Sequence, residues 1–321
     1  MKRISQEKID LFKKMVDQSQ KILISAHVNP DGDALGSSLS LRRSLEKYGK
    51  EVEVIKVSEI DDYLKFLPEL DNYKDLDQED FDLFIVLDCS ELDRIGKAMD
   101  IFEKTPKSIV VDHHVGGKIS CDLNIIESKS PATCELVFEI IERLDLPMDE
   151  TIAYLLYTGL VTDTGRFMYD NVSRQTFDAA GRLLDYGADF QDIYKNLYQN
   201  KEKSKMKFET EILSRVNFFD NKAYVGIREA DCEEFGVQIG DSESIVNMLR
   251  DLNGVEVACI LKEYGPKEYK VSLRSKDYVD VSEIARANGG GGHIRASGFS
   301  IEKDTFEEAE KALLKILEGI D

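Results

Sequence analysis

The segment KILISAHVNPDGDALGSSLSLRRSLEKYG, residues 21–49, contains the change of hydrophobic period that decides the fold. Its first part, KILISAH at 21–27, is short, apolar and β-branched, which predicts a buried strand. From residue 34 the apolar side chains recur near helical spacing, and Gly49 stands where that helix would end. The next segment, EVEVIKV at 51–57, again has the composition of a strand. Strand, helix and strand in this order predict a right-handed crossover between parallel strands.

The same alternation continues further along the chain. DLFIVLD at 82–88 and SIVVD at 108–112 have the composition of two more buried strands. Three helices are then predicted at 134–144, 149–161 and 173–187, where they would cover the sheet or flank its edge. Residues 1–188 are therefore expected to form an α/β domain with a parallel sheet and flanking helices.

A second, smaller domain is expected because 321 residues exceed the ~250 to 300 that a single core usually organises. Residues 189–221 are polar and helix-prone, and we interpret them as a helical linker. Their run of alternating lysines fits a solvated helix better than a phosphate-steering patch. Residues 222–321 should form an α/β domain with a mixed sheet. Its predicted strands and helices are AYVGI at 223–227, VEVACIL at 255–261, YKVSLRS at 269–275, GFSIE at 298–302, and helices at 242–252 and 305–318.

Composition limits the partners that the protein can bind. The net charge of -20 argues against tracking along a long nucleic acid, because such binding needs many Lys and Arg contacts to phosphates. No signal peptide and no apolar run long enough for a membrane span is visible, so a cytoplasmic location without membrane contact is expected. The five scattered cysteines suggest buried thiols rather than disulfides or a zinc site. The oligomeric state stays open, and a homodimer is compatible with the sequence.

Residues with ligand-type side chains gather where the predicted strands end. In an open parallel sheet the ligand crevice lies beyond the carboxyl ends of the strands, so distant segments meet there. HVNPDGDA follows the first strand, VLDCS the third, VVDHHVGG the fourth, and VTDTGRF follows an apolar helix. The candidates are His27, Asp31, Asp33, Asp88, Asp112, His113, His114 and Asp163.

Each of these residues also has a simpler explanation. An aspartate after a strand often caps a turn, and Asp33 could simply cap the helix that follows it. A single histidine is usually structural. The joint arrangement favours a metal site, because three of the four histidines lie at predicted strand ends with aspartates beside them. Two imidazoles and four carboxylates without sulfur suit Mn²⁺, Mg²⁺, Fe²⁺ or Co²⁺, and their number suits a pair of ions that share a bridging carboxylate.

The C-terminal part carries a second signal in NGGGGHIRASGF, residues 288–299. Its glycines, including Gly290, Gly291 and Gly292, would let the backbone approach an anion closely. His293 and Arg295 would add charge or hydrogen bonds. A flexible linker can look the same, but the histidine that follows and the flanking strands favour contact with a phosphate or nucleotide. Arg274, at the end of its own strand, is a second anion-binding candidate, with an ordinary surface arginine as the alternative.

Taken together, these motifs resemble those of the DHH phosphoesterases that carry a DHH-associated C-terminal domain, and most of all the bacterial nano-RNases that also act as phosphoadenosine phosphate (pAp) phosphatases. The resemblance covers nearly the whole chain and includes five ordered motifs: HVNPDGDA, VLDCS, VDHHVGG, VTDTGRF and GGGGHIRASGF. RecJ-like exonucleases carry further nucleic-acid-binding parts that this chain lacks. Pyrophosphatases of this superfamily have a different C-terminal signature.

The resemblance implies a role for each matching residue. One metal would be held by His27, Asp31 and Asp88, and Asp88 would bridge to the other. The ligands implied for the second metal are Asp33, Asp88, His113 and Asp163. His114 would face the scissile phosphate and stabilise or protonate the leaving oxygen, while Asp112 orients the histidine pair. The C-terminal residues would bind the nucleotide end away from the metals and close a cleft between the domains; these are Arg274, Gly290, Gly291, Gly292 and His293.

The implied activity is hydrolysis of short oligoribonucleotides to mononucleotides and of pAp to AMP, with two divalent metal ions as cofactors. Manganese is the leading expectation, and Mg²⁺, Co²⁺ and Fe²⁺ are the alternatives. Stand-alone phosphodiesterases for cyclic dinucleotides or linear diadenylate are the main competing interpretation. A nucleotide-binding regulator without turnover is a further one, although a pure binder would not need His114 beside a complete ligand set.

Overall fold

A computed structural model describes residues 2–76, 80–114 and 119–320. The last three residues of the VVDHHVGG motif lie outside these ranges. Within the described part, the chain divides into two compact units, Met1–Asn200 and Lys201–Asp321. The segment interpreted from the sequence as a linker, 189–221, contributes residues to both units.

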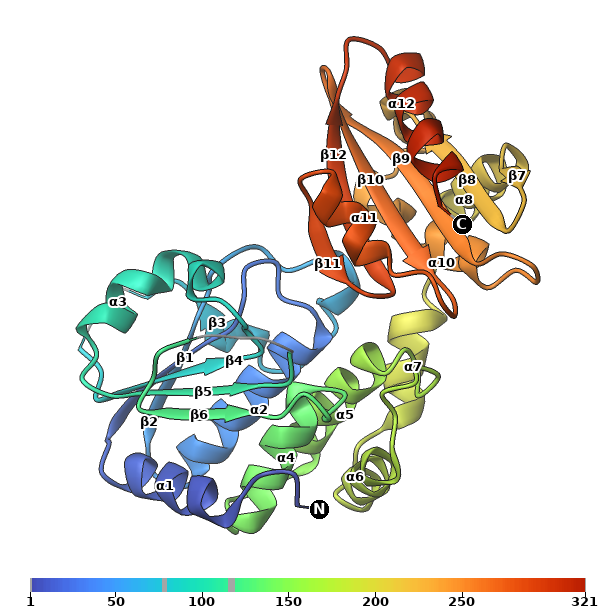
Figure 1. The fold of residues 1–321 in the computed structure, drawn as a ribbon. Coiled ribbons are helices and arrows are strands. Elements are labelled where there is room, and N and C mark those ends of the chain that lie inside the picture. The colour runs from blue at the N-terminus through green and yellow to red at the C-terminus, as the bar shows by residue number, and fades with distance from the viewer. Residues whose placement is uncertain (1, 77–79, 115–118, 321) are drawn as a thin grey trace. The chain divides into compact units, whose positions relative to one another are not determined.

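Unit 1 is built on a six-stranded sheet with the order β3-β2-β1-β4-β5-β6, and every neighbouring pair in it is parallel (Figure 1). The prediction of a parallel α/β sheet is confirmed. The strands are β1 (Lys21–Ser25), β2 (Glu51–Ile55), β3 (Tyr73–Lys74), β4 (Leu83–Leu87), β5 (Ser108–Asp112) and β6 (Leu123–Ile126). The edge strands β3 and β6 were not predicted, because one has only two residues and the other only four.

Helices cover both faces of this sheet. A large apolar core lies between the sheet and α1, α2, α4 and α5, and a smaller core lies on the face that carries η3 and α3. The helices are α1 (Gln6–Asp17), α2 (Gly32–Lys47), α3 (Met99–Lys104), α4 (Thr133–Arg143), α5 (Glu150–Asp163), α6 (Arg174–Asp185) and α7 (Phe190–Tyr198). The short 3-10 helices are η1 (Asp62–Leu64), η2 (Leu70–Asn72) and η3 (Leu92–Ala98).

Unit 2 contains a second six-stranded sheet with the order β11-β12-β10-β9-β8-β7. Only the pair β8–β9 is parallel, so the sheet is mixed, as predicted. The strands are β7 (Asn217–Phe219), β8 (Lys222–Ile227), β9 (Val257–Gly265), β10 (Glu268–Ser275), β11 (Gly291–His293) and β12 (Ala296–Glu302). The helices are α8 (Lys203–Ser214), α9 (Glu229–Phe235), α10 (Glu243–Arg250), α11 (Val281–Ala287) and α12 (Phe306–Glu318), with the 3-10 helix η4 (Ile239–Ser242).

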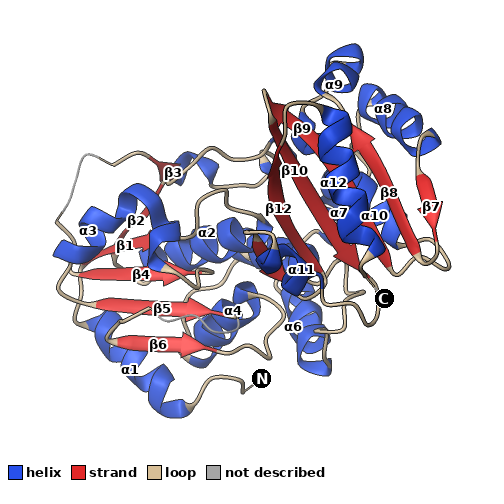
Figure 2. Cartoon of the chain, turned by 45° about the horizontal axis from the view of Figure 1, so that its top comes forward, coloured by secondary structure: helices blue, strands red, loops and turns tan. Residues whose placement is uncertain are grey.

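The two faces of this second sheet differ in what covers them. One face packs its apolar side chains, such as Val271 and Leu273, against α11 and α12. The other face packs Ala258 and Ile260 against α8 and α10. Figure 2 shows α12 lying along the strands of this sheet. No helix in the described ranges is both long enough and apolar enough to cross a membrane.

Candidate active site

The first group of candidate ligands lies where β1 leads into α2. The Nδ1 atom of His27 lies 2.9 Å from the carbonyl oxygen of Val28, so we assign its proton to Nδ1. This leaves Nε2 facing two carboxylates, at 3.6 Å from Asp88 Oδ2 and 3.9 Å from Asp31 Oδ2. Ligand atoms of His27, Asp31 and Asp88 all lie within 4.8 Å of one another.

A second group lies beside the first. The Nε2 atom of His113 is 3.2 Å from Asp163 Oδ2, 3.4 Å from Asp88 Oδ1 and 3.9 Å from Asp33 Oδ2. Asp33, His113 and Asp163 also offer ligand atoms within 4.8 Å of one another. Because Asp88 approaches both His27 and His113, it is the carboxylate that connects the two groups.

The chain holds Asp88 in an uncommon conformation at the end of β4. Its φ of 52° lies in the left-handed region, which non-glycine residues rarely adopt and which tends to occur at functional sites. Its backbone N–H donates to the Val111 carbonyl at 3.0 Å. The hydroxyl of Thr133 donates to its Oδ1 atom at 3.1 Å. One hydrogen bond therefore holds the backbone of Asp88 and another holds its carboxylate, and the residue is 1% exposed.

The sequence did not identify Thr133, and it connects both groups. This residue begins α4, and its backbone N–H and that of Cys134 donate to Asp33 at 2.6 and 2.8 Å. The start of α4 therefore holds Asp33, while the Thr133 side chain holds Asp88. The alternative that Asp33 caps α2 is wrong, because Asp31 is the residue that caps this helix, through Oδ1 and the N–H groups of Asp33 and Ala34.

His114 is held by a hydrogen bond with Asp112. Its Nδ1 atom lies 2.7 Å from Asp112 Oδ1, and its backbone N–H donates to the same oxygen at 3.2 Å. The hydrogen bond assigns the proton to Nδ1. The His113 and His114 rings lie with centroids 4.5 Å apart. Asp112 is fully buried, so its carboxylate accepts a hydrogen bond from the imidazole and does not contact solvent.

Crowding of charges changes the pKa values of the cluster. Burial, together with the negative charges of Asp31 and Asp88, raises the pKa of Asp163 to about 7 against the opposing attraction of His113. Burial also acts on Asp88, but its close contacts with His113 and His27 outweigh burial and hold the pKa of Asp88 well below its usual value. Burial lowers the pKa of His27, yet the contact with Asp88 prevails and raises it to about 9. Without bound metal ions, Asp163 and His27 therefore tend to keep their protons, and divalent ions would replace these protons.

The donor set fits divalent metal ions. The Nε2 atom of His113 is buried, and no described residue hydrogen-bonds to it with good geometry, as expected of an imidazole nitrogen that binds metal. Carboxylates and imidazoles suit Mn²⁺, Mg²⁺, Co²⁺ or Fe²⁺. The buried Cys134 thiol lies close to Asp33, but burial raises its pKa well above the usual value and leaves no thiolate ligand.

In unit 2 the strand register places Arg274 and His293 on the same face of the sheet. Both pair with Ala296, Arg274 from β10 and His293 from β11. Residues directly opposite one another in antiparallel strands share a face. Ser272 and Gly291 form the next row, since both pair with Gly298.

The carboxylate of Glu243, at the start of α10, binds several polar side chains on this face. It accepts hydrogen bonds from Ser272 Oγ at 3.0 Å and from the Arg274 guanidinium at 3.3 Å, and it pairs with Lys262. Strands β9 and β10 thus place two cations and a hydroxyl around one carboxylate. No motif in the sequence indicates this arrangement.

The glycine run has a structural reason as well as the predicted functional one. A Cβ atom on Gly290 would lie 2.1 Å from the Gly298 carbonyl oxygen, and one on Gly292 would lie 2.6 Å from the Ala296 carbonyl oxygen. Gly292 also has a φ of 135°. A Cβ on Gly289 or on Gly291 would meet nothing within 4 Å, so these two positions have open space beside them.

Arg295 has a different role from the expected anion contact. Its guanidinium donates to the carbonyl oxygen of Val279 at 2.8 Å and to that of Asp277. These bonds tie together the loop before α11.

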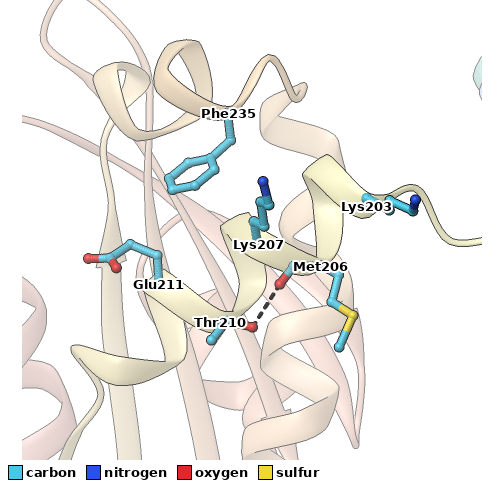
Figure 3. A pocket seen from close by; sticks show the side chains of 6 residues that line it. All are labelled: Lys203, Met206, Lys207, Thr210, Glu211 and Phe235. Atoms are coloured by element: carbon cyan, nitrogen blue, oxygen red, sulfur yellow. Dashed lines mark hydrogen bonds between the residues drawn. The ribbon is translucent and has the colours of Figure 1, made fainter.

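A separate groove on unit 2 contains none of the predicted site residues (Figure 3). It lies on α8 and α9, where the Thr210 hydroxyl donates to the Met206 carbonyl at 2.8 Å. Its lining residues are Lys203, Met206, Lys207, Thr210, Glu211 and Phe235.

Comparison with known proteins places this geometry in a family. Residues 21–160 match the DHH family, N-terminal domain, and residues 221–319 match the DHHA1 domain. The chain belongs to the DHH family, and the resemblance predicted from its motifs is confirmed.

Individual relatives cover nearly the full chain. The bifunctional oligoribonuclease and PAP phosphatase NrnA of Thermus thermophilus is 31% identical over 92% of this chain and 88% of its own length. The protein of the same name from Bacillus subtilis is 29% identical over 91% of this chain and 92% of its own length. Among solved structures, an exopolyphosphatase-related protein from Bacteroides fragilis is 33% identical with a TM-score of 0.93, covering 99% of this chain and 97% of the other.

Proposed function

We propose that this chain is a metal-dependent phosphoesterase that hydrolyses short oligoribonucleotides to mononucleotides and pAp to AMP. The observation that carries the proposal is the meeting of histidines and aspartates from four distant segments. Asp88 belongs to one group with His27 and Asp31 and to another with His113 and His114, and His113 also belongs to a group with Asp33 and Asp163. The activities named for the Thermus and Bacillus relatives, which match over nine tenths of this chain, support the choice of substrates.

The proposed ligands are those that the sequence predicts. His27, Asp31 and Asp88 would hold one ion, and Asp33, His113 and Asp163 would hold the other together with Asp88. When bound, two divalent cations would lower the pKa of the attacking water and offset charge on the phosphoryl oxygens. We propose Mn²⁺ as the preferred ion, because carboxylate and imidazole donors suit it and no thiolate is present.

Side chains of the protein would protonate the leaving oxygen and bind the nucleotide. Water adds to phosphorus, the ester P–O bond breaks, and the leaving oxygen needs a proton. The imidazolium form of His114 is the proposed donor of that proton: it gives up the proton on Nε2 and keeps the one on Nδ1, which Asp112 holds at 2.7 Å. In unit 2, Arg274, His293 and the glycines Gly290, Gly291 and Gly292 are the proposed contacts for the nucleotide. A cytoplasmic location and a dimeric assembly stay predictions from the sequence.

A turnover panel with Mn²⁺ tests this proposal. The substrates are pAp, RNA dimers to pentamers, an RNA of ~20 nucleotides, linear and cyclic diadenylate, and pyrophosphate. We expect release of AMP from pAp, release of mononucleotides from the short RNAs, and a steep fall in kcat/KM towards the long RNA, since the acidic chain offers little attraction to further phosphates. Turnover of diadenylates alone would instead favour a signalling phosphodiesterase, and undiminished degradation of the long RNA would favour a RecJ-like exonuclease.

A further inference from the structure

The turn that follows the candidate ligand Asp163 has an unusual backbone. Gly165, Arg166 and Phe167 have successive φ values of 53°, 66° and 63°. Two of these residues carry side chains, which rarely adopt this left-handed conformation. The Arg166 N–H donates to the Val161 carbonyl at 2.8 Å, and the Phe167 N–H donates to Thr164 Oγ1 at 2.9 Å. The turn is therefore held firmly at the end of α5.

This turn separates the two side chains that it carries. Phe167 packs against the core of unit 1, with its ring stacked on that of Phe177 at 5.5 Å. Arg166 is exposed, and its guanidinium lies 4.8 Å from the centre of the Tyr198 ring. In the parts of the chain that the structure covers, its side chain has no ion pair and no hydrogen bond, although acidic residues outnumber basic ones by 62 to 42. Arg166 is thus a cation that the fold leaves available for a ligand.

Exposed tyrosines lie around the same turn. Tyr198, Tyr169 and Tyr63 are 38%, 43% and 48% exposed. The Tyr169 ring covers Gly165, where a Cβ atom would lie 2.4 Å from it. Tyr198, at the end of α7, carries Arg166 on its ring, and α7 packs against η1, which contains Tyr63.

Tyr63 also lies close to the metal cluster. Partial burial, followed by the negative charges of Asp31 and Asp163, raises the pKa of its phenol above the usual value. Tyr198 contributes in the same direction. The turn that carries Arg166 directly follows α5, whose last residue is the candidate ligand Asp163, so the turn adjoins the cluster. All of these residues belong to unit 1.

We infer that Arg166, Tyr63, Tyr169 and Tyr198 form a nucleobase-binding shelf beside the metal cluster. The shelf would stack on the base of the nucleotide whose phosphate lies at the cluster, and the inference rests on the proposed function in taking that ligand to be a nucleotide. Exposed aromatic rings offer little to a phosphate, whereas every base has a π-face that stacks on them without sequence preference. A guanidinium stacked on tyrosine extends the surface and adds cation–π attraction.

The shelf would make unit 1 selective for nucleotides among phosphate compounds. A cluster of metal ligands alone would accept any phosphate ester that reaches it. A base-binding shelf beside the cluster would favour nucleotides over sugar phosphates and pyrophosphate. It would also favour purines over pyrimidines, because purines have the larger ring surface.

Binding of AMP and of ribose 5-phosphate to the full-length, Mg²⁺-loaded protein tests the shelf, because the two ligands share a phosphate and a ribose but only one has a base. Calorimetry should show AMP binding roughly 5- to 100-fold tighter, the range expected for stacking of one base. Tyr198→Leu and Arg166→Gln should each remove most of this difference by weakening AMP alone. Tyr198→Phe should retain it. The fluorescence of 2-aminopurine riboside monophosphate gives a second readout, since stacking quenches it and the chain contains no tryptophan.

Matched controls separate the shelf from general effects. Tyr48→Leu changes a tyrosine of similar exposure, 36%, that contacts Lys13 and Asp17 on the surface of the same unit. Arg174→Gln changes an arginine whose side chain is 92% exposed. Neither should alter the preference for AMP.

The outcomes for the shelf and for the proposed function are distinct. Equal affinity of the unchanged protein for AMP and ribose 5-phosphate, or equal weakening of both ligands in Tyr198→Leu, overturns the shelf even if short RNA is hydrolysed. A base preference that depends on Tyr198 and Arg166 supports the shelf even if the turnover panel finds no oligoribonuclease activity.

Discussion

Replacing Asp88 by asparagine should remove both metal ions, because this residue connects the two ligand groups. Asparagine keeps the size of the side chain and an oxygen that can accept the Thr133 hydroxyl bond of 3.1 Å. It loses the negative charge that lies 3.4 Å from His113 Nε2 and 3.6 Å from His27 Nε2. The change therefore tests charge and coordination with little alteration of packing.

The expected magnitude follows from these short distances. Two unit charges about 4 Å apart interact by roughly 4 kcal/mol at an effective dielectric constant of about 20. A divalent ion carries twice that charge, so a loss of at least about 4 kcal/mol is expected for each ion, which corresponds to metal binding weaker by about a thousandfold or more. Turnover depends on both ions together, so kcat/KM for pAp should fall by at least about a thousandfold.

Asp82→Asn is the matched control for this experiment. Asp82 and Asp88 flank the same strand, β4, but Asp82 lies at its opposite end and accepts hydrogen bonds from the N–H groups of Gln20 and Lys21 at 2.8 Å. Metal content after gel filtration and turnover with Mn²⁺ should both stay near the original values in this variant. If Asp88→Asn retains two equivalents of metal or more than about a tenth of the activity, the bridging role is refuted.

Three further predictions concern metal binding and nucleotide binding. Thr133→Val should weaken metal binding by about 10- to 100-fold in a metal titration, because it removes a hydroxyl that orients Asp88 and leaves the backbone bonds of α4 in place; unchanged metal affinity would contradict this role. Arg274→Ala and His293→Ala should raise KM or reduce kcat/KM for nucleotides while metal content stays intact, and a parallel loss of metal would show that these residues act elsewhere. The stabilisation by Mn²⁺ in thermal unfolding should be larger at pH 8 than at pH 6. The pKa of Asp163 is raised to about 7 from an ordinary 3.8, so the metal-free folded state holds a proton that the unfolded state has lost, and its stability falls as the pH rises through this interval. Metal ions replace that proton, and a pH-independent shift would argue against a site at Asp163.

Much of unit 1 could be predicted because its strands are short apolar runs that are buried on both faces. The predicted strand at 82–88 corresponds to β4, whose five residues are all buried. Strand β3 was not predicted because Tyr73–Lys74 is too short to show alternating hydrophobicity. Helix α11 was not predicted for a similar reason, since it has only seven residues. Hydrophobic periodicity is informative only when an element presents several turns or several alternations to a core.

The proximity of the candidate ligands could be predicted because parallel topology brings strand ends together, but the contacts that hold these residues could not. Thr133 acts on Asp88 across 45 positions of sequence, and Glu243 contacts Arg274 across 31. The partners in each pair are too far apart in the sequence to form a short motif. Thr133 and Glu243 therefore look like ordinary surface or helix residues. Such contacts depend on how α4 packs on the sheet of unit 1 and how α10 packs on the sheet of unit 2, which a single sequence does not specify.

Asp31 and Asp33 each accept hydrogen bonds from the start of a helix, Asp31 from α2 and Asp33 from α4, and both are also candidate metal ligands. Asp31 uses Oδ1 to accept the first N–H groups of α2, while its Oδ2 atom faces His27 at 3.9 Å. Asp33 is held by the N–H groups of Thr133 and Cys134, at the start of α4. A helix N-terminus carries partial positive charge and favours the ionised carboxylate, which is the form that binds metal. Two helix starts aimed at one crevice therefore fix the direction of these carboxylates and offset part of the repulsion between them. This explains how a buried cluster of aspartates can exist in the folded chain before any metal binds.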